Sequence, residues 1–316
     1  MDTQEGIVTK TTGKEYSVLR ENECYTCKLK GQFRIKGIKT TNPIAVGDHV
    51  MFTFDPLNPS NDGVIVDICP RKNYIYRKSV NLSKITHIIA ANIDSAFLIV
   101  SLTDPKTPLG FIDRFLVSAE AFRIATTIVF NKYDLYSQED KIQAQRLADV
   151  YQKIHYPCLF TSARNGMGLD TLTNAMKNKV SLFCGQSGVG KSSIVNSIEP
   201  GLHLKTGEIS QYNEKGKHTT TFAQMHALNM GGYIIDTPGI KEFGLIEYKK
   251  EEVCHYFPEM LSLQNQCRFS NCTHTHEPDC MVKQAVENGD IALWRYNNYL
   301  AIINSEDINR KEWTLK

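Results

Sequence analysis

The sequence predicts an α/β fold in three parts: an N-terminal β-barrel, a central doubly wound parallel sheet and a small helical domain at the C-terminal end. Up to residue 77 the chain consists of short alternating runs separated by turn residues. From there to residue 245, apolar strand-like segments alternate with amphipathic helical segments. Beyond residue 245, short helical pieces accompany a cluster of cysteines and histidines. We therefore expect domains at residues 1–77, 78–245 and 246–316.

Composition limits the class of protein. The chain has 316 residues, a formal net charge of +2 and a pI near 8.0, and this charge is too small to indicate nucleic-acid binding by itself. The opening MDTQEGIVTK lacks the apolar core of a signal peptide, and the longest apolar run, residues 96–100, is far too short to span a membrane. Nine irregularly spaced cysteines suit a reducing compartment. We expect a cytoplasmic monomer without a membrane segment.

Five alternating segments in the first part predict a compact barrel of the OB type, which closes without exposed strand edges. Such barrels often bind RNA on a basic face with interleaved aromatic residues. The candidates here are Tyr25, Lys28, Lys30, Phe33, Arg34, Lys36 and Lys39. The alternative is that these residues form the solvated strand faces of a barrel with another function. The five segments are Gly6 to Lys10, Tyr16 to Leu19, Tyr25 to Leu29, His49 to Phe54 and Gly63 to Ile68.

The central part contains five apolar strands, each followed by a polar or glycine-bearing loop. Ligands of open α/β sheets bind at such loops, because the carboxyl ends of parallel strands meet at one edge. Phe111 to Ala121 and Leu169 to Lys177 are amphipathic and predict helices between the strands. The strands are Ala96 to Val100, Thr126 to Phe130, Cys158 to Thr161, Val180 to Cys184 and Tyr233 to Asp236.

A phosphate-binding loop follows the strand that ends at Cys184, since GQSGVGKS at 185–192 matches G-x-x-x-x-G-K-[ST]. Its glycines let backbone N–H groups surround phosphate oxygens at a helix N-terminus. Lys191 is expected to bridge the β- and γ-phosphates, and the Ser192 hydroxyl to bind Mg²⁺. The expected nucleotide contacts are Gly185, Gln186, Ser187, Gly188, Val189, Gly190, Lys191, Ser192 and Ser193.

A guanine-specific element lies upstream, where Asn131, Lys132, Tyr133 and Asp134 fit N-K-x-D. Asp134 can accept hydrogen bonds from N1 and N2 of guanine, a donor pair that adenine lacks. Asn131 can serve the O6/N7 side, and the stem of Lys132 can lie along the base with its head near the phosphate-binding loop. In the next loop, Ser162 and Ala163 can cap guanine O6. An ATP-dependent ATPase or kinase is the alternative, and it requires these motifs to be coincidental.

Downstream, DTPG at 236–239 fits the D-x-x-G element of GTPases. Asp236 is expected to hold Mg²⁺ through water, and the Gly239 N–H to meet the γ-phosphate. The polar segment 205–221 contains HTTT, and one of Thr219, Thr220 and Thr221, for which we take Thr220, could complete the Mg²⁺ shell when the γ-phosphate is present, as a switch segment does. Ile240 stands where many GTPases have a water-orienting glutamine. The intrinsic hydrolysis rate should therefore be slow, with His218 as the candidate group within the chain.

Ordinary GTPases carry the phosphate-binding loop first and the guanine-specific elements last, whereas this order is circularly permuted. Permutation is tolerated because the termini of compact domains often lie close together. The C-terminal part then follows directly after D-x-x-G, so we expect it to be connected directly to the segment that moves with nucleotide state. An RNA-binding scaffold with a vestigial nucleotide site is a second alternative, against which the intact Lys191, Ser192 and Asp236 argue.

A metal site is predicted in the C-terminal part, where three cysteines and two histidines lie between residues 267 and 280. Three thiolates and one imidazole form a closed tetrahedral zinc set of the structural type. The cysteines are Cys267, Cys272 and Cys280, and the spacing allows His274 or His276 as the fourth ligand. The alternative is a small domain with free cysteines.

The permuted order, GQSGVGKSS at 185–193, GKHTTT at 216–221, DTPG at 236–239 and the C-x4-C-x-H-x5-C spacing together resemble the RsgA (YjeQ) family of ribosome-dependent GTPases. The resemblance covers essentially the whole chain. It departs only at Lys217, where that family often has arginine. It implies a circularly permuted P-loop GTPase domain between an N-terminal OB-type β-barrel and a C-terminal zinc-binding helical domain. It also implies a GTP hydrolase stimulated by the 30S subunit.

The resemblance further implies a role in late maturation of the 30S subunit, with contacts to 16S rRNA, and with GTP or GDP bound together with Mg²⁺. It assigns one structural Zn²⁺ to Cys267, Cys272, His274 and Cys280, which leaves His276 outside the shell.

Overall fold

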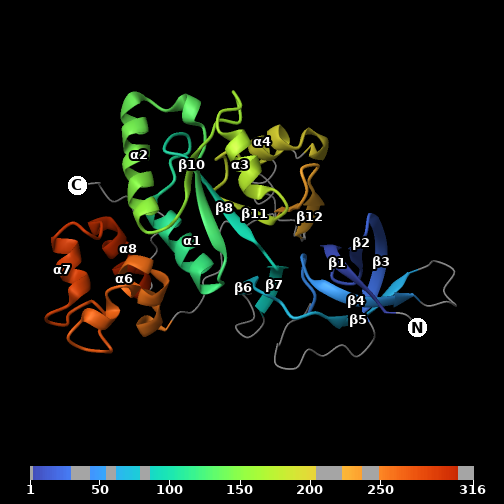
Figure 1. Ribbon diagram of the computed structural model, residues 1–316, viewed down its shortest axis with the longest axis horizontal. Helices are drawn as coiled ribbons and strands as arrows, with labels where there is room; N and C mark the ends of the chain where they lie inside the picture. Colours follow the sequence, from blue (N-terminus) through green and yellow to red (C-terminus); the bar gives the residue numbers. More distant parts are fainter. Residues whose placement is uncertain are drawn as a thin grey trace, which may run out of the picture.

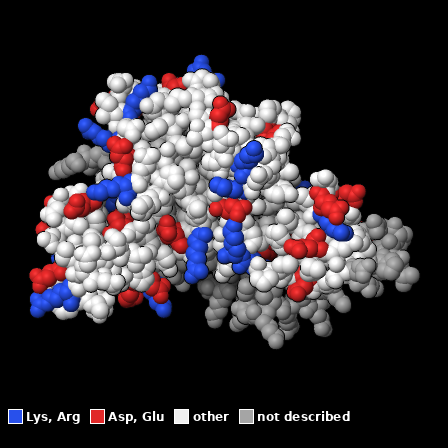
Figure 2. Space-filling view, viewed as in Figure 1, with Lys and Arg blue, Asp and Glu red and all other residues white. Residues whose placement is uncertain are grey.

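The computed structural model describes residues 3–29, 43–54, 62–78, 86–203, 223–236 and 249–304, with the backbone alone at 76–78, 86, 87 and 236. Figure 1 shows the N-terminal strands at one end of the long axis, an α/β part in the centre and C-terminal helices at the other end. No helix within these ranges is both long and apolar enough to cross a bilayer. On the face in Figure 2, basic and acidic side chains are interspersed, in keeping with the small net charge.

Five strands close the N-terminal barrel, which confirms the predicted architecture of this part. They pair in the order β1-β2-β3-β5-β4, and β4 pairs back with β1. Alternate residues, among them Val8, Val18, Phe52 and Ile65, point inward and form a core of their own. The strands are β1 (Gln4–Thr11), β2 (Tyr16–Arg20), β3 (Glu23–Leu29), β4 (His49–Phe54) and β5 (Gly63–Ile68).

A hairpin that the sequence analysis did not identify follows the barrel. β6 (Tyr74–Lys78) and β7 (Thr86–Ala91) form a separate antiparallel sheet, so the expected boundary at 77/78 falls inside β6. The Ala91 N–H donates to the Val46 carbonyl of the barrel side at 2.8 Å. Val46, Ile75 and Ala90 belong to the same buried cluster as the central sheet. The hairpin therefore joins the barrel to the central part through a shared core.

The central sheet has the strand order β10-β9-β8-β11-β13-β12 and is parallel except for β12 at its edge. The sheet does not end at β12, because β1 of the barrel pairs with it antiparallel at Lys10 and Gln224. The barrel and the central sheet thus form one continuous ladder of eleven strands. The central strands are β8 (Ser95–Val100), β9 (Ala125–Phe130), β10 (Cys158–Phe160), β11 (Val180–Cys184), β12 (Gln224–Ala227) and β13 (Tyr233–Asp236).

Helices cover both faces of the central sheet, as the doubly wound prediction requires (Figure 1). Leu98 and Leu182 face a cluster that includes residues of α1 and α2, whereas Phe97 and Phe183 face α3 and α4. Helix α2 begins with a capping box, in which Ser137 and Asp140 bond each other's backbone N–H. The elements are α1 (Leu109–Ala121), η1 (Tyr133–Leu135), α2 (Gln138–Lys153), α3 (Leu169–Met176), α4 (Lys191–Ile198) and η2 (Pro200–Leu202).

The C-terminal part consists of short helices around a second core. Its elements are η3 (Lys250–Tyr256), α6 (Pro258–Leu261), η4 (Gln264–Gln266), α7 (Met281–Glu287) and α8 (Leu293–Ile303). Each part sends a residue into the core of the other: Val117 of α1 joins the C-terminal core, and Trp294 of α8 joins the central one. The C-terminal part is therefore anchored on α1, in addition to following D-x-x-G in the chain as the sequence order predicted.

A buried ion network reinforces this interface. Arg295 Nη1 donates to Asp113 Oδ1 at 2.6 Å, and the same guanidinium donates to both carboxylate oxygens of Glu259 at 2.7 and 3.0 Å. Asp113 also accepts from Asn298 at 2.6 Å and from the Tyr151 hydroxyl at 3.0 Å. Burial raises the pKa of Asp113, although Arg295 and these donors oppose the shift. Both carboxylate oxygens of Asp113 thus accept hydrogen bonds from side chains of other helices.

Candidate nucleotide site and metal centre

The candidate nucleotide site lies where β9, β10 and β11 end, at one edge of the sheet. Hydrogen bonds connect the loops that follow these strands. Asn131 Nδ2 donates to the Val189 carbonyl at 2.8 Å, which joins the N-K-x-D segment to the phosphate-binding loop. Asn131 Oδ1 accepts from Thr161 Oγ1 at 3.1 Å, and the Tyr133 N–H donates to the Thr161 carbonyl at 3.1 Å. Three motifs that are far apart in the sequence are thus held together.

The phosphate-binding loop has the backbone that the motif requires. Gly185, Gly188 and Gly190 have φ of +145°, +82° and +94°, values that side chains rarely allow. A Cβ at Gly185 would lie 2.2 Å from the Ile99 carbonyl oxygen, and one at Gly190 would lie 2.5 Å from Asn131 Nδ2. Helix α4 follows at once, and Gly190 supplies no side chain to cap it. Its first N–H groups can therefore bind an anion.

Lys191 closes this loop from inside. Its ammonium donates to the carbonyl oxygens of Gly185 and Gln186 at 2.8 and 2.7 Å. The adjacent Ser192 is buried at the start of α4. Phosphate oxygens are stronger partners for an ammonium than neutral carbonyls, because both groups are then charged. A bound phosphate chain can therefore compete with these carbonyls for Lys191.

The groups expected to recognise the base lie at the other side of the site. Asp134 is exposed, and its Oδ1 accepts a hydrogen bond from Ser162 Oγ at 2.6 Å. The carboxylate can therefore accept further hydrogen bonds from a ligand in solvent. Tyr133 is directed away, since its ring packs 5.2 Å from Phe160 and 5.4 Å from Tyr136. The ammonium of Lys132 donates to the backbone oxygen of Asp104 in the loop after β8, whereas the sequence predicted its head near the backbone of the phosphate-binding loop.

Several expected site residues cannot be placed. Thr220, His218 and Gly239 lie outside the described residues. Asp236 is the last residue of β13, where its backbone is described without its side chain. Of the expected guanine cap, Ser162 is fully buried, and the Ala163 carbonyl accepts from Ser197 Oγ at 3.2 Å.

The barrel face expected to bind RNA is partly described. Lys28 is paired with Asp62 at 3.1 Å, and Tyr25 packs its ring 5.7 Å from Phe52 and 5.1 Å from Phe54. These contacts reduce the free charge and the free ring surface that the two residues offer. The other candidates, Lys30, Phe33, Arg34, Lys36 and Lys39, lie outside the described residues.

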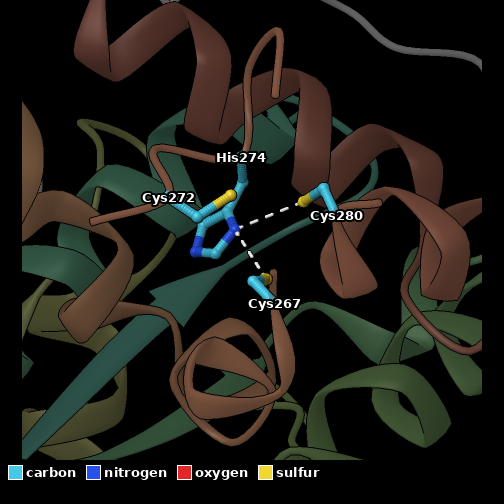
Figure 3. Close-up of side chains that lie close together, drawn as sticks. All are labelled: Cys267, Cys272, His274 and Cys280. Atoms are coloured by element: carbon cyan, nitrogen blue, oxygen red, sulfur yellow. Dashed lines mark hydrogen bonds between the residues drawn. The ribbon is translucent and has the colours of Figure 1, made fainter. Parts of the chain in front are cut away.

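The candidate metal centre brings together Cys267, Cys272, His274 and Cys280, whose ligand atoms all lie within 4.8 Å of one another. Figure 3 shows His274 with Nδ1 turned toward the sulfurs of Cys267 and Cys280, at 3.6 and 3.4 Å. The corresponding edge of a tetrahedron with Zn–S of 2.3 Å and Zn–N of 2.0–2.1 Å is about 3.6 Å. The set therefore fits a tetrahedral metal ion of that size.

Burial also suits a metal at this position. It raises the pKa of the Cys272 thiol to about 12, and Cys280 and Cys267 add to the shift, so a cation is the group that would hold these sulfurs as thiolates. His274 Nδ1 is the ring nitrogen that faces the sulfurs. The other nitrogen, Nε2, is buried without a hydrogen-bond partner among the described residues. His276 is exposed and bonds Thr275 Oγ1 at 2.9 Å. The choice between the two histidines, open from the spacing, falls on His274.

The segment that carries these ligands is itself well bonded. Glu277 accepts from the N–H groups of Thr273 and Thr275 at 2.8 and 2.9 Å. These bonds, with one from the Thr273 hydroxyl, outweigh burial and hold the pKa of Glu277 at about 2. The Tyr296 hydroxyl of α8 donates to the His274 carbonyl at 2.7 Å. The ligand loop is therefore fixed to α8, which also carries Arg295.

One further loop lies at this edge of the sheet and was not predicted from the sequence. Residues 101–108 follow β8, whose end lies between those of β9 and β11, and this loop touches both the base-recognising segment and the phosphate-binding loop. Its sequence, SLTDPKTP, matches no motif. Its place after a central parallel strand is the feature that could have indicated it.

Comparison with known proteins covers nearly the whole chain. The family model for the RsgA GTPase matches residues 68–246, and that for the RsgA N-terminal domain matches residues 5–65. A protein of Flavobacterium psychrophilum named small ribosomal subunit biogenesis GTPase RsgA is 50% identical over 303 residues, 96% of this chain and 93% of that protein. One of the same name from Christiangramia forsetii is 48% identical over 306 residues, 96% and 97% of the two chains.

Two solved structures are similar over their full length. YjeQ from Thermotoga maritima superposes with a TM-score of 0.79 at 37% identity, covering 96% of this chain and 98% of its own. YloQ, described as a circularly permuted GTPase, has a TM-score of 0.75 at 28% identity and covers 99% and 98%.

Proposed function

The chain belongs to the RsgA GTPase family, and from this premise we propose that it binds GTP at the ends of β9, β10 and β11 and hydrolyses it while acting in biogenesis of the small ribosomal subunit. As a member of that family it is a GTPase with a circularly permuted domain. The observation that carries the site assignment is the bond from Asn131 to Val189, which links a guanine-specific motif to a phosphate-binding loop. An ATP-dependent kinase does not bind guanine and would therefore not require a guanine-specific motif bonded to its phosphate-binding loop.

In the proposed complex, the phosphates lie over the N–H groups of residues 185–193, and Lys191 leaves the Gly185 and Gln186 carbonyls for the β- and γ-phosphates. Asp134, oriented by Ser162, accepts from N1 and N2 of guanine, while Asn131 serves the opposite edge and the stem of Lys132 lies along the base. These groups bind and orient the nucleotide before any bond is broken.

Mg²⁺ would be held by Ser192, by Asp236 through water, and by a threonine of 219–221, for which we propose Thr220. When bound, the ion neutralises charge that develops on the β- and γ-phosphate oxygens. The Gly239 N–H would meet the γ-phosphate, and His218 would orient the attacking water.

The base assignment is tested by Asp134→Asn. The amide places a donor opposite a guanine donor, so the affinity for GTP and GDP should fall about 10- to 150-fold, whereas xanthosine triphosphate should bind better than to wild type. Asp149→Asn, an exposed carboxylate on α2, is the matched control and should leave both affinities unchanged. Unaltered GTP binding by Asp134→Asn would show that this segment does not recognise the base.

Hydrolysis should be slow in the isolated protein, because Ile240 cannot orient water as a glutamine does. We propose that docking on the small ribosomal subunit and its 16S rRNA supplies the missing arrangement. In other GTPases a group supplied by a partner raises the rate roughly 10³- to 10⁵-fold, or about 4 to 7 kcal/mol of barrier. Turnover measured with and without purified subunits checks this, and a fast rate without them would contradict it. A cytoplasmic location follows from this partner, and the chain is proposed to act as a monomer.

We further propose that Cys267, Cys272, His274 and Cys280 hold one structural Zn²⁺. Three thiolates and an imidazole suit zinc, and no position is left for a reacting water. Cys272→Ser should abolish the single equivalent of zinc found by elemental analysis. Cys254→Ser is the matched control, because Cys254 is buried in the same core outside the cluster and should leave zinc content unchanged. Full zinc content in Cys272→Ser would exclude the assignment.

A further inference from the structure

The loop between β8 and α1, residues 101–108, has a defined shape. The Ser101 N–H donates to Thr107 Oγ1 at 3.1 Å, and the Thr107 N–H donates back to the Ser101 carbonyl at 2.7 Å. Both residues are buried, with 0% and 2% of their surface exposed. The two bonds close the base of the loop, so residues 102–106 project from a fixed ring at the sheet edge that carries the candidate nucleotide site.

Two bonds attach this loop to the base-recognising segment. The Leu102 N–H donates to the Tyr136 hydroxyl at 2.9 Å, two residues beyond Asp134 in the chain. Tyr136 is itself buried, 4% exposed, so this hydroxyl is a fixed acceptor. On the other side of the loop, the Asp104 carbonyl accepts from the ammonium of Lys132. The head of Lys132 is thereby attached to this loop.

The same loop also contacts the phosphate-binding loop. A Cβ built on Gly188 would lie 3.3 Å from Cδ of Pro105 and 3.5 Å from its Cγ. The pyrrolidine ring therefore packs against the outer turn of the glycine loop, which is otherwise exposed at this residue. Residues 101–108 thus bridge the two halves of the site, with Pro105 on one half and Lys132 and Tyr136 on the other.

We propose that the β8–α1 loop is a positioning element for guanine nucleotides, and that Tyr136 and Thr107 are the positioning residues that hold it. This inference rests on the proposed function of the site. The loop fixes the head of Lys132 and thereby orients the stem of this side chain toward the base. The loop also supports the turn at Gly188, which binds the phosphates. Groups fixed beforehand lose less conformational entropy on binding, so the loop strengthens nucleotide affinity without direct contact from Tyr136 or Thr107.

The loop should act equally on GDP and GTP, because its contacts concern the base side and the glycine turn. Tyr136→Phe removes one oxygen and leaves the Leu102 N–H without its partner, and Thr107→Val does the same to the Ser101 N–H. An unsatisfied buried donor corresponds to roughly a 5- to 100-fold change in an equilibrium constant. Part of this loss lowers the stability of the protein, and the rest weakens nucleotide binding. We expect both dissociation constants to rise by the same factor, about 5- to 30-fold, in each variant.

The experiment compares the dissociation constants of GDP and a non-hydrolysable GTP analogue, with binding stoichiometry, for wild type, Tyr136→Phe, Thr107→Val and Thr107→Ser. Serine keeps the hydroxyl and should restore affinity. Tyr156→Phe is the matched control, since it removes an equally buried hydroxyl, bonded to Glu120 at 2.9 Å, away from the loop. It should lower stability and leave both dissociation constants unchanged. In GTP turnover, the change should fall on KM.

The inference is supported if Tyr136→Phe and Thr107→Val lose the same factor of affinity for both nucleotides at full binding stoichiometry, and if Thr107→Ser keeps the wild-type affinity. Unchanged affinities in Tyr136→Phe and Thr107→Val would overturn it, as would equal weakening by Tyr156→Phe, which would indicate a general loss of stability. A loss confined to the GTP analogue would also overturn it, because it would place the effect at the γ-phosphate. Failure of wild type itself to bind either nucleotide would instead refute the proposed function.

Discussion

Replacing Arg295 with methionine should lower the free energy of unfolding by about 3 to 5 kcal/mol, because it strands two carboxylates in the interface between α1 and the C-terminal helices. The side chains of Arg295, Asp113 and Glu259 are 1%, 0% and 8% exposed. Arg295→Met keeps most of the side-chain volume and removes the charge. Glu259 loses two bonds of 2.7 and 3.0 Å, and Asp113 loses one of 2.6 Å.

The magnitude is limited by what remains around Asp113. It keeps the bonds from Asn298 and Tyr151, and without Arg295 its pKa should rise further, which lowers the cost of the buried carboxylate by favouring its uncharged form. This relaxation keeps the loss near the usual range for breaking a buried pair. Replacing all three residues together, as R295M with D113N and E259Q, removes every charge, keeps an acceptor for Asn298 and Tyr151, and should recover part of the stability.

Urea unfolding at neutral pH, without any chelator, measures the effect. Trp294 is buried beside Tyr151 at a ring distance of 5.5 Å, so its fluorescence reports on this interface. Arg268→Met is the matched control: it breaks a 2.8 Å pair with Asp279 whose side chains are 62% and 68% exposed, which should change stability by about 0 to 1 kcal/mol. If Arg295→Met loses no more than Arg268→Met, the reasoning from burial is refuted.

Three further predictions concern stability. Ser137→Ala removes the side-chain half of the capping box with Asp140 and should cost about 1 kcal/mol by urea unfolding; no measurable loss would contradict the role of this cap. Leu182→Ala in β11 opens a cavity in a fully buried site and should cost about 2 to 5 kcal/mol, whereas Ile142→Ala, 48% exposed on α2, should cost far less; similar losses would contradict the burial argument. On the proposed zinc assignment, adding a chelator should remove hydrogen-exchange protection from residues 267–303, and retained protection would show that this part folds without a metal.

The sequence predicted the strands of this fold well wherever apolar residues and turns bounded them. Segments expected at His49 to Phe54, Gly63 to Ile68, Val180 to Cys184 and Tyr233 to Asp236 agree with the structure residue for residue. Strand β12 was missed, because Gln-Met-His-Ala has no strong β pattern, although it forms a hairpin with β13 across a turn that contains Gly231 and Gly232. Its pairing with β1, more than 200 residues earlier in the chain, leaves no local trace in the sequence.

The candidate site was predictable to the extent that motifs mark it. The glycine loop and the N-K-x-D segment are recognisable from side-chain types, because their chemistry requires those residues. The contribution of residues 101–108 was not recognisable, since Leu102 and Asp104 act through backbone atoms that any residue would supply. The spacing left His274 and His276 open and only the family resemblance favoured His274; the orientation of the His274 ring toward the sulfurs supplies the physical reason (Figure 3).

The pairing of β1 with β12 gives the barrel a protective role, whatever else it binds. A strand at the open edge of a sheet exposes N–H and C=O groups that can pair with another molecule, and this is a common route to aggregation. Here β1 lies along β12, and Ala223 and Met225 beside it belong to the core that also contains Val46. A chain cut at the start of residues 78–245 would expose this edge together with apolar surface, and should self-associate in proportion to its concentration. We therefore expect the central part to need the barrel in order to stay in solution.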